Sequence, residues 1–197
     1  MVSVHLSRMS FVLILTLVAS NVYPAATRFE RRFAKTVPRE MQDKLALEYV
    51  ESHHNAYIAL VWPRAVDQIN SIMAELEKHA TLIYHRPIVL SAYHDALTVF
   101  YHNCHRDVTF DRADYLITNF YLQDVLPPYQ VIVILFRTNK SLADRNQIKR
   151  DLRNEIGISF WSLHFSDEPR DTLELASVVF SQGQIDMLNQ GTFSPTI

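Results

Sequence analysis

Two continuous apolar runs constrain the fold of this chain more than any other sequence feature. Residues Tyr57–Trp62 and Tyr129–Phe136 each have the length of a strand, and Pro63 closes the first run. An apolar run of this length without alternating polar residues, here with Gln130 as the one polar residue of the second run, is typical of a strand that is buried on both faces. The sequence therefore predicts a sheet whose buried strands are covered by helices.

The segments around these runs alternate between helical and strand patterns. Apolar residues recur at helical spacing over Ala65–His79, and Thr81–Leu90 has strand composition with Pro87 at an edge or a bulge. Further helices are expected over 40–52, 92–101, 112–120 (within an excursion over 102–128), 141–154 (capped by Ser141 and ended by Gly157) and 170–180 (opened by Pro169), and a last strand over 158–165. This β-α-β-α-β-α-β-α order suits a ferredoxin-like domain or a small doubly wound sheet, and periodicity does not choose between them.

The N-terminal segment differs in character from the rest of the chain. Arg8 precedes the apolar run Phe11–Ala19, which ends at the small residues Val18-Ala19-Ser20. This pattern is typical of a secretory signal peptide, and the run is short for a membrane-spanning helix. We therefore expect a secreted or membrane-associated protein, with a cytoplasmic domain as the alternative. The sequon Asn139-Lys140-Ser141 does not decide between them.

The length of the chain sets its expected organisation. With 197 residues, it has room for one domain of ordinary size and no second one. We expect a signal peptide or membrane-targeting segment over residues 1–26, a linker and extra helix over 27–52, the domain over 53–190 and a tail over 191–197.

Composition excludes several function classes. The net charge of −2 argues against nucleic acid as a partner, because binding to phosphates requires clustered Lys and Arg. Cys104 is the single cysteine, so the chain cannot form an intrachain disulfide or a Cys-rich zinc site. The nine histidines show no metal-ligand spacing, and we expect no metal centre. Glycine-rich phosphate loops and the Gly-x-Ser-x-Gly motif are also absent from the sequence.

The C-terminal half contains the motif that carries chemistry. Residues Ile148-Lys149-Arg150-Asp151-Leu152 and Gly157 precede Leu163-His164-Phe165-Ser166-Asp167, and a helix with Asp171-Thr172-Leu173-Glu174 follows. This order resembles the phosphohistidine region of a nucleoside diphosphate kinase. The segment from Tyr57 to Leu90 is similar to the first strand, first helix and second strand of that family, so the resemblance spans about residues 57–180.

The resemblance implies a fold and a reaction. The implied fold is an α+β, ferredoxin-like (nucleoside diphosphate kinase-like) antiparallel sheet covered by helices, here with an N-terminal extension. His164 would take a phosphoryl group from a nucleoside triphosphate, with Mg²⁺ bound to the nucleotide, and pass it to a diphosphate. Ser166 and Asp167 would orient and cap the turn, and Glu174 would be the nearest replacement for the carboxylate that holds the histidine in that family. A neutral imidazole suits this role because it is nucleophilic near pH 7.

The phosphate-binding residues match the family less closely. Lys149 or Arg150 would replace an arginine that lies near the phosphates in the family. The position of the family's lysine is occupied by Trp62, and Arg64 would supply the missing positive charge from a neighbouring position. Leu175 or Ala176 falls where the family has the carboxylate that holds the histidine. The segment between Phe136 and Lys149 is also too short for the family's phosphate-binding loop, and the position of an asparagine before the histidine holds Trp161.

Two function classes therefore remain open. A diverged enzyme would bind a nucleoside triphosphate or diphosphate and would bring Arg64, Lys149, Arg150 and His164 to one open pocket. A catalytically inactive domain would act as an interaction module for a protein partner or for a second copy in a homo-oligomer, would need no cofactor, and would have His164 covered by Trp161 or Phe165.

Overall fold

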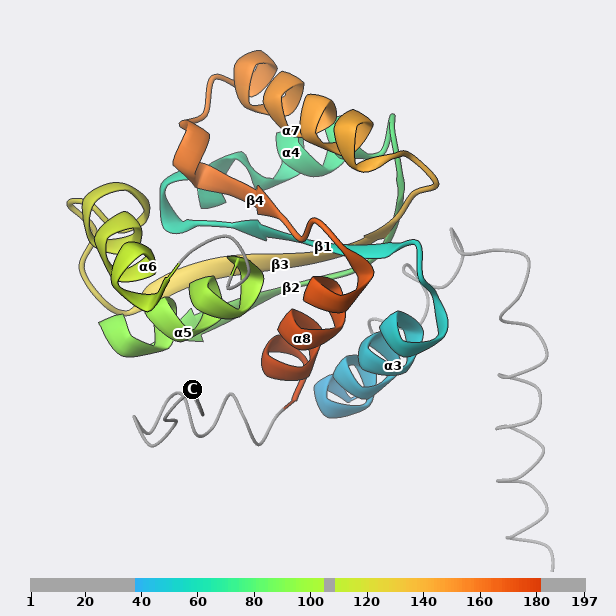
Figure 1. The fold of residues 1–197 in the computed structure, drawn as a ribbon, viewed down its shortest axis with the longest axis horizontal. Helices are drawn as coiled ribbons and strands as arrows, with labels where there is room; N and C mark the ends of the chain where they lie inside the picture. Colours follow the sequence, from blue (N-terminus) through green and yellow to red (C-terminus); the bar gives the residue numbers. More distant parts are fainter. Residues whose placement is uncertain (1–37, 105–108, 182–197) are drawn as a thin grey trace, which may run out of the picture. The chain divides into compact units, whose positions relative to one another are not determined.

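Four strands form one antiparallel sheet in a computed structural model, which describes residues 38–104 and 109–181 of the chain (Figure 1). The strands are β1 (Ala56–Val61), β2 (Thr81–Leu90), β3 (Tyr129–Arg137) and β4 (Leu163–Phe165), in the spatial order β2-β3-β1-β4. Each neighbouring pair is antiparallel. This pairing excludes a doubly wound parallel sheet, and the α+β architecture is consistent with a ferredoxin-like arrangement.

Helices cover both faces of the sheet (Figure 1). On one face lie α4 (Ile69–Leu76) and α7 (Leu142–Ile156), which contact each other. On the other face, α8 (Pro169–Val179) contacts β1, α5 (Tyr93–Cys104) and α3 (Arg39–Ser52). Buried apolar side chains of β1, β3 and β4 form a cluster with Ile72, Leu76, Ile148 and Leu152 of α4 and α7.

The two apolar runs form the central strands, as predicted. Every residue of β1 is buried, and so is every residue of β3 from Val131 to Phe136. Both strands have a neighbour on each side and helices on each face, so residues 56–61 and 131–136 are kept from water. This explains why neither run carries the alternating polar residues of a half-exposed strand.

The helix ends follow the capping signals in the sequence. Ser141 caps α7 in a capping box with Asp144, and Gly157 ends the helix in the left-handed region at φ 73°. Pro169 occupies the first turn of α8. The predicted helix over 65–79 begins instead as a 3₁₀ turn, η1 (Pro63–Gln68), and continues as α4 to Leu76.

The last predicted strand, 158–165, is wrong over most of its length. Only Leu163–Phe165 pairs with β1. The backbone N–H of Ile158 donates to the carbonyl of Arg153 at 3.0 Å, and Phe160–Ser162 form a 3₁₀ turn, η3. The chain therefore uses these five residues to leave α7 and turn towards the sheet, although their composition favours a strand.

The excursion between β2 and β3 contains α6 (Phe110–Leu116) and a π-helical turn, η2 (Ile117–Tyr121). The wider turn places two consecutive aromatic residues, Phe120 and Tyr121, at the end of the helix. Single π turns of this kind occur often at functional sites. The predicted helix over 112–120 is thus confirmed, with a different geometry in its last turn.

Several sequence predictions lie outside the described residues, namely the leader, most of the linker and the tail. Within residues 38–104 and 109–181, no helix combines the length and the apolar character that a membrane crossing requires.

Candidate functional site

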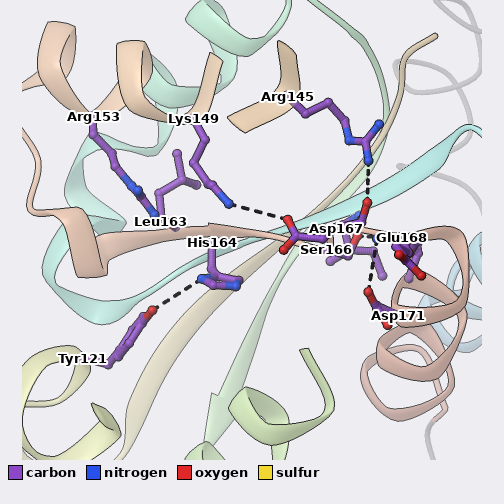
Figure 2. Close-up of polar contacts among 12 residues, drawn as sticks. Tyr121, Arg145, Lys149, Arg153, Leu163, His164, Ser166, Asp167, Glu168 and Asp171 are labelled. Carbon is purple, nitrogen blue, oxygen red and sulfur yellow. Dashed lines mark hydrogen bonds and ion pairs between the residues drawn. The ribbon is translucent and has the colours of Figure 1, made fainter. Parts of the chain in front are cut away.

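His164 lies in the middle of β4, opposite Leu60 of β1. Its neighbours in sequence, Leu163 and Phe165, pack into the cluster beneath α7. Because successive side chains of a strand point to opposite faces, the imidazole points to the face that α5 and η2 cover. Figure 2 shows His164 on that side with Tyr121, whose hydroxyl lies 3.4 Å from Nδ1 of the histidine.

Two basic side chains approach β4 from the other face. Lys149 and Arg153 come from α7, as Figure 2 shows, and Arg153 donates a hydrogen bond to the carbonyl of Leu163. Both side chains are buried, and the guanidinium of Arg153 also lies 4.1 Å from the centre of the Phe160 ring. The strand therefore separates His164 from the nearest cations of α7.

These charges nevertheless act on the histidine through space. Burial, followed by the positive charges of Lys149 and Arg153, lowers the pKa of His164 to about 3. Burial also lowers the pKa of Lys149, while the carboxylate of Asp167 opposes that shift. The imidazole is consequently neutral at physiological pH, as a nucleophile must be, and its surroundings resist any positive charge on the ring.

Ser166 joins three elements rather than pointing to the histidine. Its hydroxyl accepts a hydrogen bond from the backbone N–H of Ile58 at 3.0 Å and lies 2.7 Å from the hydroxyl of Thr172. The backbone N–H of Ser166 donates to the carbonyl of Ile58 at 2.8 Å. Both hydroxyl residues are fully buried, so Ser166 connects β1, the end of β4 and α8.

Asp167 is held by the basic residues of α7 (Figure 2). Its carboxylate lies 3.7 Å from the ammonium of Lys149, and its backbone carbonyl accepts a hydrogen bond from Arg145. Of the predicted phosphate-binding residues, Lys149 is therefore already paired, and its side chain is only 11% exposed. This pairing attaches the turn after β4 to α7.

The other predicted site residues make their contacts elsewhere. Glu174 accepts a hydrogen bond from Arg170, one turn earlier in α8, at 2.7 Å. Arg150 is exposed and donates to Gln147 at 2.7 Å. Arg64, in η1, lies 3.7 Å from the carboxylate of Asp124. The structure thus brings His164, Ser166 and Asp167 together on one segment, with Lys149 paired to Asp167, and gives Arg64, Arg150 and Glu174 partners elsewhere.

An aromatic cluster, formed by Trp62, Phe100 and Tyr121, partly covers His164, which is itself half-buried. The Tyr121 ring lies 4.6 Å from Phe100 and 5.1 Å from Trp62, and Phe100 lies 6.2 Å from the imidazole, all between ring centres. Trp62 is fully buried, and among the described residues its indole N–H meets no hydrogen-bond acceptor. The predicted covers, Trp161 and Phe165, do not fill this role, because Phe165 points to the opposite face and Trp161 packs on Tyr121 and Phe120. No motif indicates Tyr121 or Phe100, although aromatic residues are frequent in the excursion.

A second group of aromatic rings reaches the surface next to this cluster. We call it the aromatic strip; it consists of Tyr115, Phe120, Trp161 and Phe160. Phe120 and Trp161 stack with their ring centres 4.5 Å apart, and Tyr115 and Phe160 continue the strip at 5.9 and 4.8 Å. Tyr115 is 48% exposed and Phe160 57% exposed. Arg112 at one end and Arg153 at the other lie over the rings of Tyr115 and Phe160.

Neither a metal site nor a protein family is assigned to the described part of the chain. In the described part of the chain, no group of three or more His, Cys, Asp or Glu side chains is placed to hold a metal ion. A scan against protein-family models and a search of curated proteins found no match to this chain.

Proposed function

We propose that this domain is a catalytically inactive, nucleoside diphosphate kinase-like fold that acts as a protein interaction module. The observation that carries the proposal is the aromatic cluster over His164. Where the resemblance expects a lysine that binds phosphate, Trp62 is fully buried and packs against Tyr121, whose hydroxyl faces the histidine. An indole provides apolar volume in place of a positive charge.

The electrostatics of the site support the same proposal. Phosphoryl transfer depends on cations that contact the transferred group and offset its negative charge. Lys149 approaches from the opposite face of β4 and pairs with Asp167, and Arg64 pairs with Asp124. A phosphoryl group on His164 would displace Tyr121 or Phe100 and would have to attract these cations away from their present partners.

One observation favours the alternative, phosphoryl transfer through His164. The lowered pKa of His164 leaves its imidazole neutral, with the charges of Lys149 and Arg153 within electrostatic reach. An opening of the aromatic cluster by a nucleoside triphosphate with Mg²⁺ would then expose a competent nucleophile. The same experiment tests both functions.

The aromatic strip is the surface that we assign to the interaction. Tyrosine, tryptophan, phenylalanine and arginine are enriched at protein interfaces. The strip contains the first three, and Arg112 and Arg153 lie over its end rings. Rings that are already stacked on one another lose little conformational freedom when a partner covers them. The partner that we infer is a second copy of the chain, because a two-fold contact would pack the exposed rings of Phe160 and Tyr115 on the same rings of the other copy.

The test combines labelling and sedimentation of the full chain. Both proteins, the wild type and His164→Ala, are incubated with γ-labelled ATP and Mg²⁺. We expect the wild type to carry no more acid-labile label than His164→Ala does. Sedimentation velocity over a concentration series should show a dimer that Phe160→Ser weakens by at least about tenfold. Leu173→Ser, which removes a 40% exposed apolar side chain on α8, is the matched control and should leave the dimer unchanged.

The opposite results separate the two functions. Label that disappears in His164→Ala would establish a phosphohistidine and exclude the inactive domain. A wild type that stays monomeric throughout the series would exclude association with a second copy.

A further inference from the structure

Asn139 lies in the short connection between β3 and α7. Residues 138–141 of this connection are neither helix nor strand, and Asn139, Lys140 and Ser141 are all exposed. Together they form the sequence Asn-Lys-Ser, and no other asparagine of the chain has Ser or Thr two positions later. An exposed Asn-x-Ser/Thr sequence without proline in its middle is the acceptor for N-linked oligosaccharide in secreted proteins.

The contacts of Asn139 leave its amide nitrogen available. Its carbonyl oxygen Oδ1 accepts a hydrogen bond from Nδ2 of Asn55 at 2.6 Å. Among the described residues, Nδ2 of Asn139 itself donates no hydrogen bond. Because a glycosylated asparagine keeps its carbonyl oxygen as an acceptor, the bond from Asn55 would survive the modification.

We propose that Asn139 is an N-glycosylation site, used when the leader over residues 1–26 directs the chain into a secretory compartment. The co-substrate is an oligosaccharide linked to a lipid through pyrophosphate. Nδ2 of Asn139 forms a bond to C1 of the first sugar, and the bond from C1 to the pyrophosphate oxygen breaks. The lipid pyrophosphate leaves with the electron pair of that bond, and one amide proton passes to a base of the transferring enzyme.

The position of Asn139 is compatible with the proposed interaction module and independent of it. β3 begins after the excursion that carries Tyr115 and Phe120, and it ends two residues before Asn139. Nine residues of strand extend over about 30 Å. Figure 1 shows the connection from β3 to α7 and the helix α6 at opposite ends of the sheet. A glycan on Asn139 would therefore leave the aromatic strip uncovered.

The test expresses the full chain with its own N-terminus in cultured eukaryotic cells and treats the secreted product with peptide N-glycosidase. The wild type should shift to higher mobility, and release in ¹⁸O-water should convert Asn139 to a heavy-isotope aspartate. Asn139→Gln should remove the shift. Ser141→Thr keeps both the acceptor sequence and the helix cap, and Asn55→Gln only displaces the neighbouring amide by one methylene, so both variants should keep the shift.

Two results would overturn the proposal. The first is a secreted wild-type chain without glycan. The second is a chain that acquires the glycan only when a foreign signal peptide replaces residues 1–26, because its own leader then does not bring Asn139 to the transferring enzyme.

Discussion

The hydroxyl of Tyr121 lies 3.4 Å from Nδ1 of His164, and this contact joins the π turn of the excursion to the last strand. The contact forms beside Phe100, which packs against the imidazole, and Trp62, which packs against Tyr121. A neutral imidazole can accept a hydrogen bond at Nδ1, whereas a protonated one cannot. Burial, together with the charges of Lys149 and Arg153, opposes protonation of His164.

The first prediction concerns the acid stability of the fold. Burial, with the charges of Lys149 and Arg153, lowers the pKa of His164 from 6.5 to about 3, so the unfolded chain takes up a proton on this residue at a pH where the folded chain does not. Above pH 6.5 the histidine is neutral in both states and has no effect. As the pH falls from 6.5 towards 3, His164 should lower the free energy of unfolding by about 1.4 kcal/mol per pH unit.

Urea unfolding at a series of pH values measures this effect. His164→Gln, which can still accept a hydrogen bond from Tyr121, should flatten the decline between pH 6.5 and 4 relative to wild type. His54→Gln is the control, because His54 is exposed. Parallel declines in the wild type and His164→Gln would show that the histidine titrates normally in the folded protein.

The second prediction concerns the attachment of α3 to the sheet. Asp43 of α3 accepts hydrogen bonds from Arg86 at 2.6 Å and from the hydroxyl of Tyr84 at 3.0 Å, both residues of β2. Arg86 also donates to the carbonyl of Val179 in α8. Asp43 and Arg86 are almost completely buried, so removing one partner leaves an uncompensated charge inside the protein.

Asp43→Ala should therefore lower the free energy of unfolding by about 3 to 5 kcal/mol in thermal or urea unfolding. The double variant Asp43→Leu with Arg86→Met should recover most of this loss, because it removes both charges and keeps apolar volume. Lys44→Ala, which breaks an exposed pair with Glu48 at 3.9 Å, should cost under about 1 kcal/mol. A similar loss in Lys44→Ala and Asp43→Ala would argue against a role for the buried pair.

Local patterns were sufficient to predict most of the elements. The apolar runs that became β1 and β3, the serine that caps α7 and the glycine that ends it all act within a few residues of their own positions. Pro169 likewise marks the start of α8. These features depend on backbone geometry and burial, which short segments of sequence encode directly.

The surroundings of His164 could not be predicted in the same way. The contact with Tyr121 joins residues that are 43 positions apart, and it requires the π turn and the pairing of His164 with Leu60. The face to which the histidine points depends on the register of β4, and a shift of one residue would turn it towards α7. A motif indicates which residue types are present but not which face of the strand they occupy.

The third prediction concerns the glycine that ends α7. Gly157 has φ 73°, and a Cβ atom at this position would meet no atom within 4 Å. Gly157→Ala should therefore cost only the strain of the left-handed backbone, about 1 kcal/mol in the free energy of unfolding. Gly157→Asn should cost less, because asparagine adopts this conformation more readily. Equal losses in the two variants would indicate a cause other than backbone strain.

The fourth prediction separates the two roles of Ser166. The buried hydroxyl bonds with Ile58 and Thr172, so Ser166→Ala leaves the N–H of Ile58 without its side-chain acceptor and removes one bond of Thr172. We expect a loss of about 1 to 3 kcal/mol in the free energy of unfolding. A serine that served only to orient a catalytic histidine would leave the unfolding midpoint almost unchanged.

Ser177→Ala is the matched control for this measurement. Its hydroxyl donates to the carbonyl of Glu174 within α8 at 2.7 Å, and the residue is half-buried rather than enclosed. Removing it should change the free energy of unfolding by about 0.5 kcal/mol or less, because water can replace the hydroxyl. A large loss in Ser166→Ala beside a small one in Ser177→Ala would assign Ser166 to the junction of β1, β4 and α8, whereas equal small losses would return it to the candidate catalytic residues.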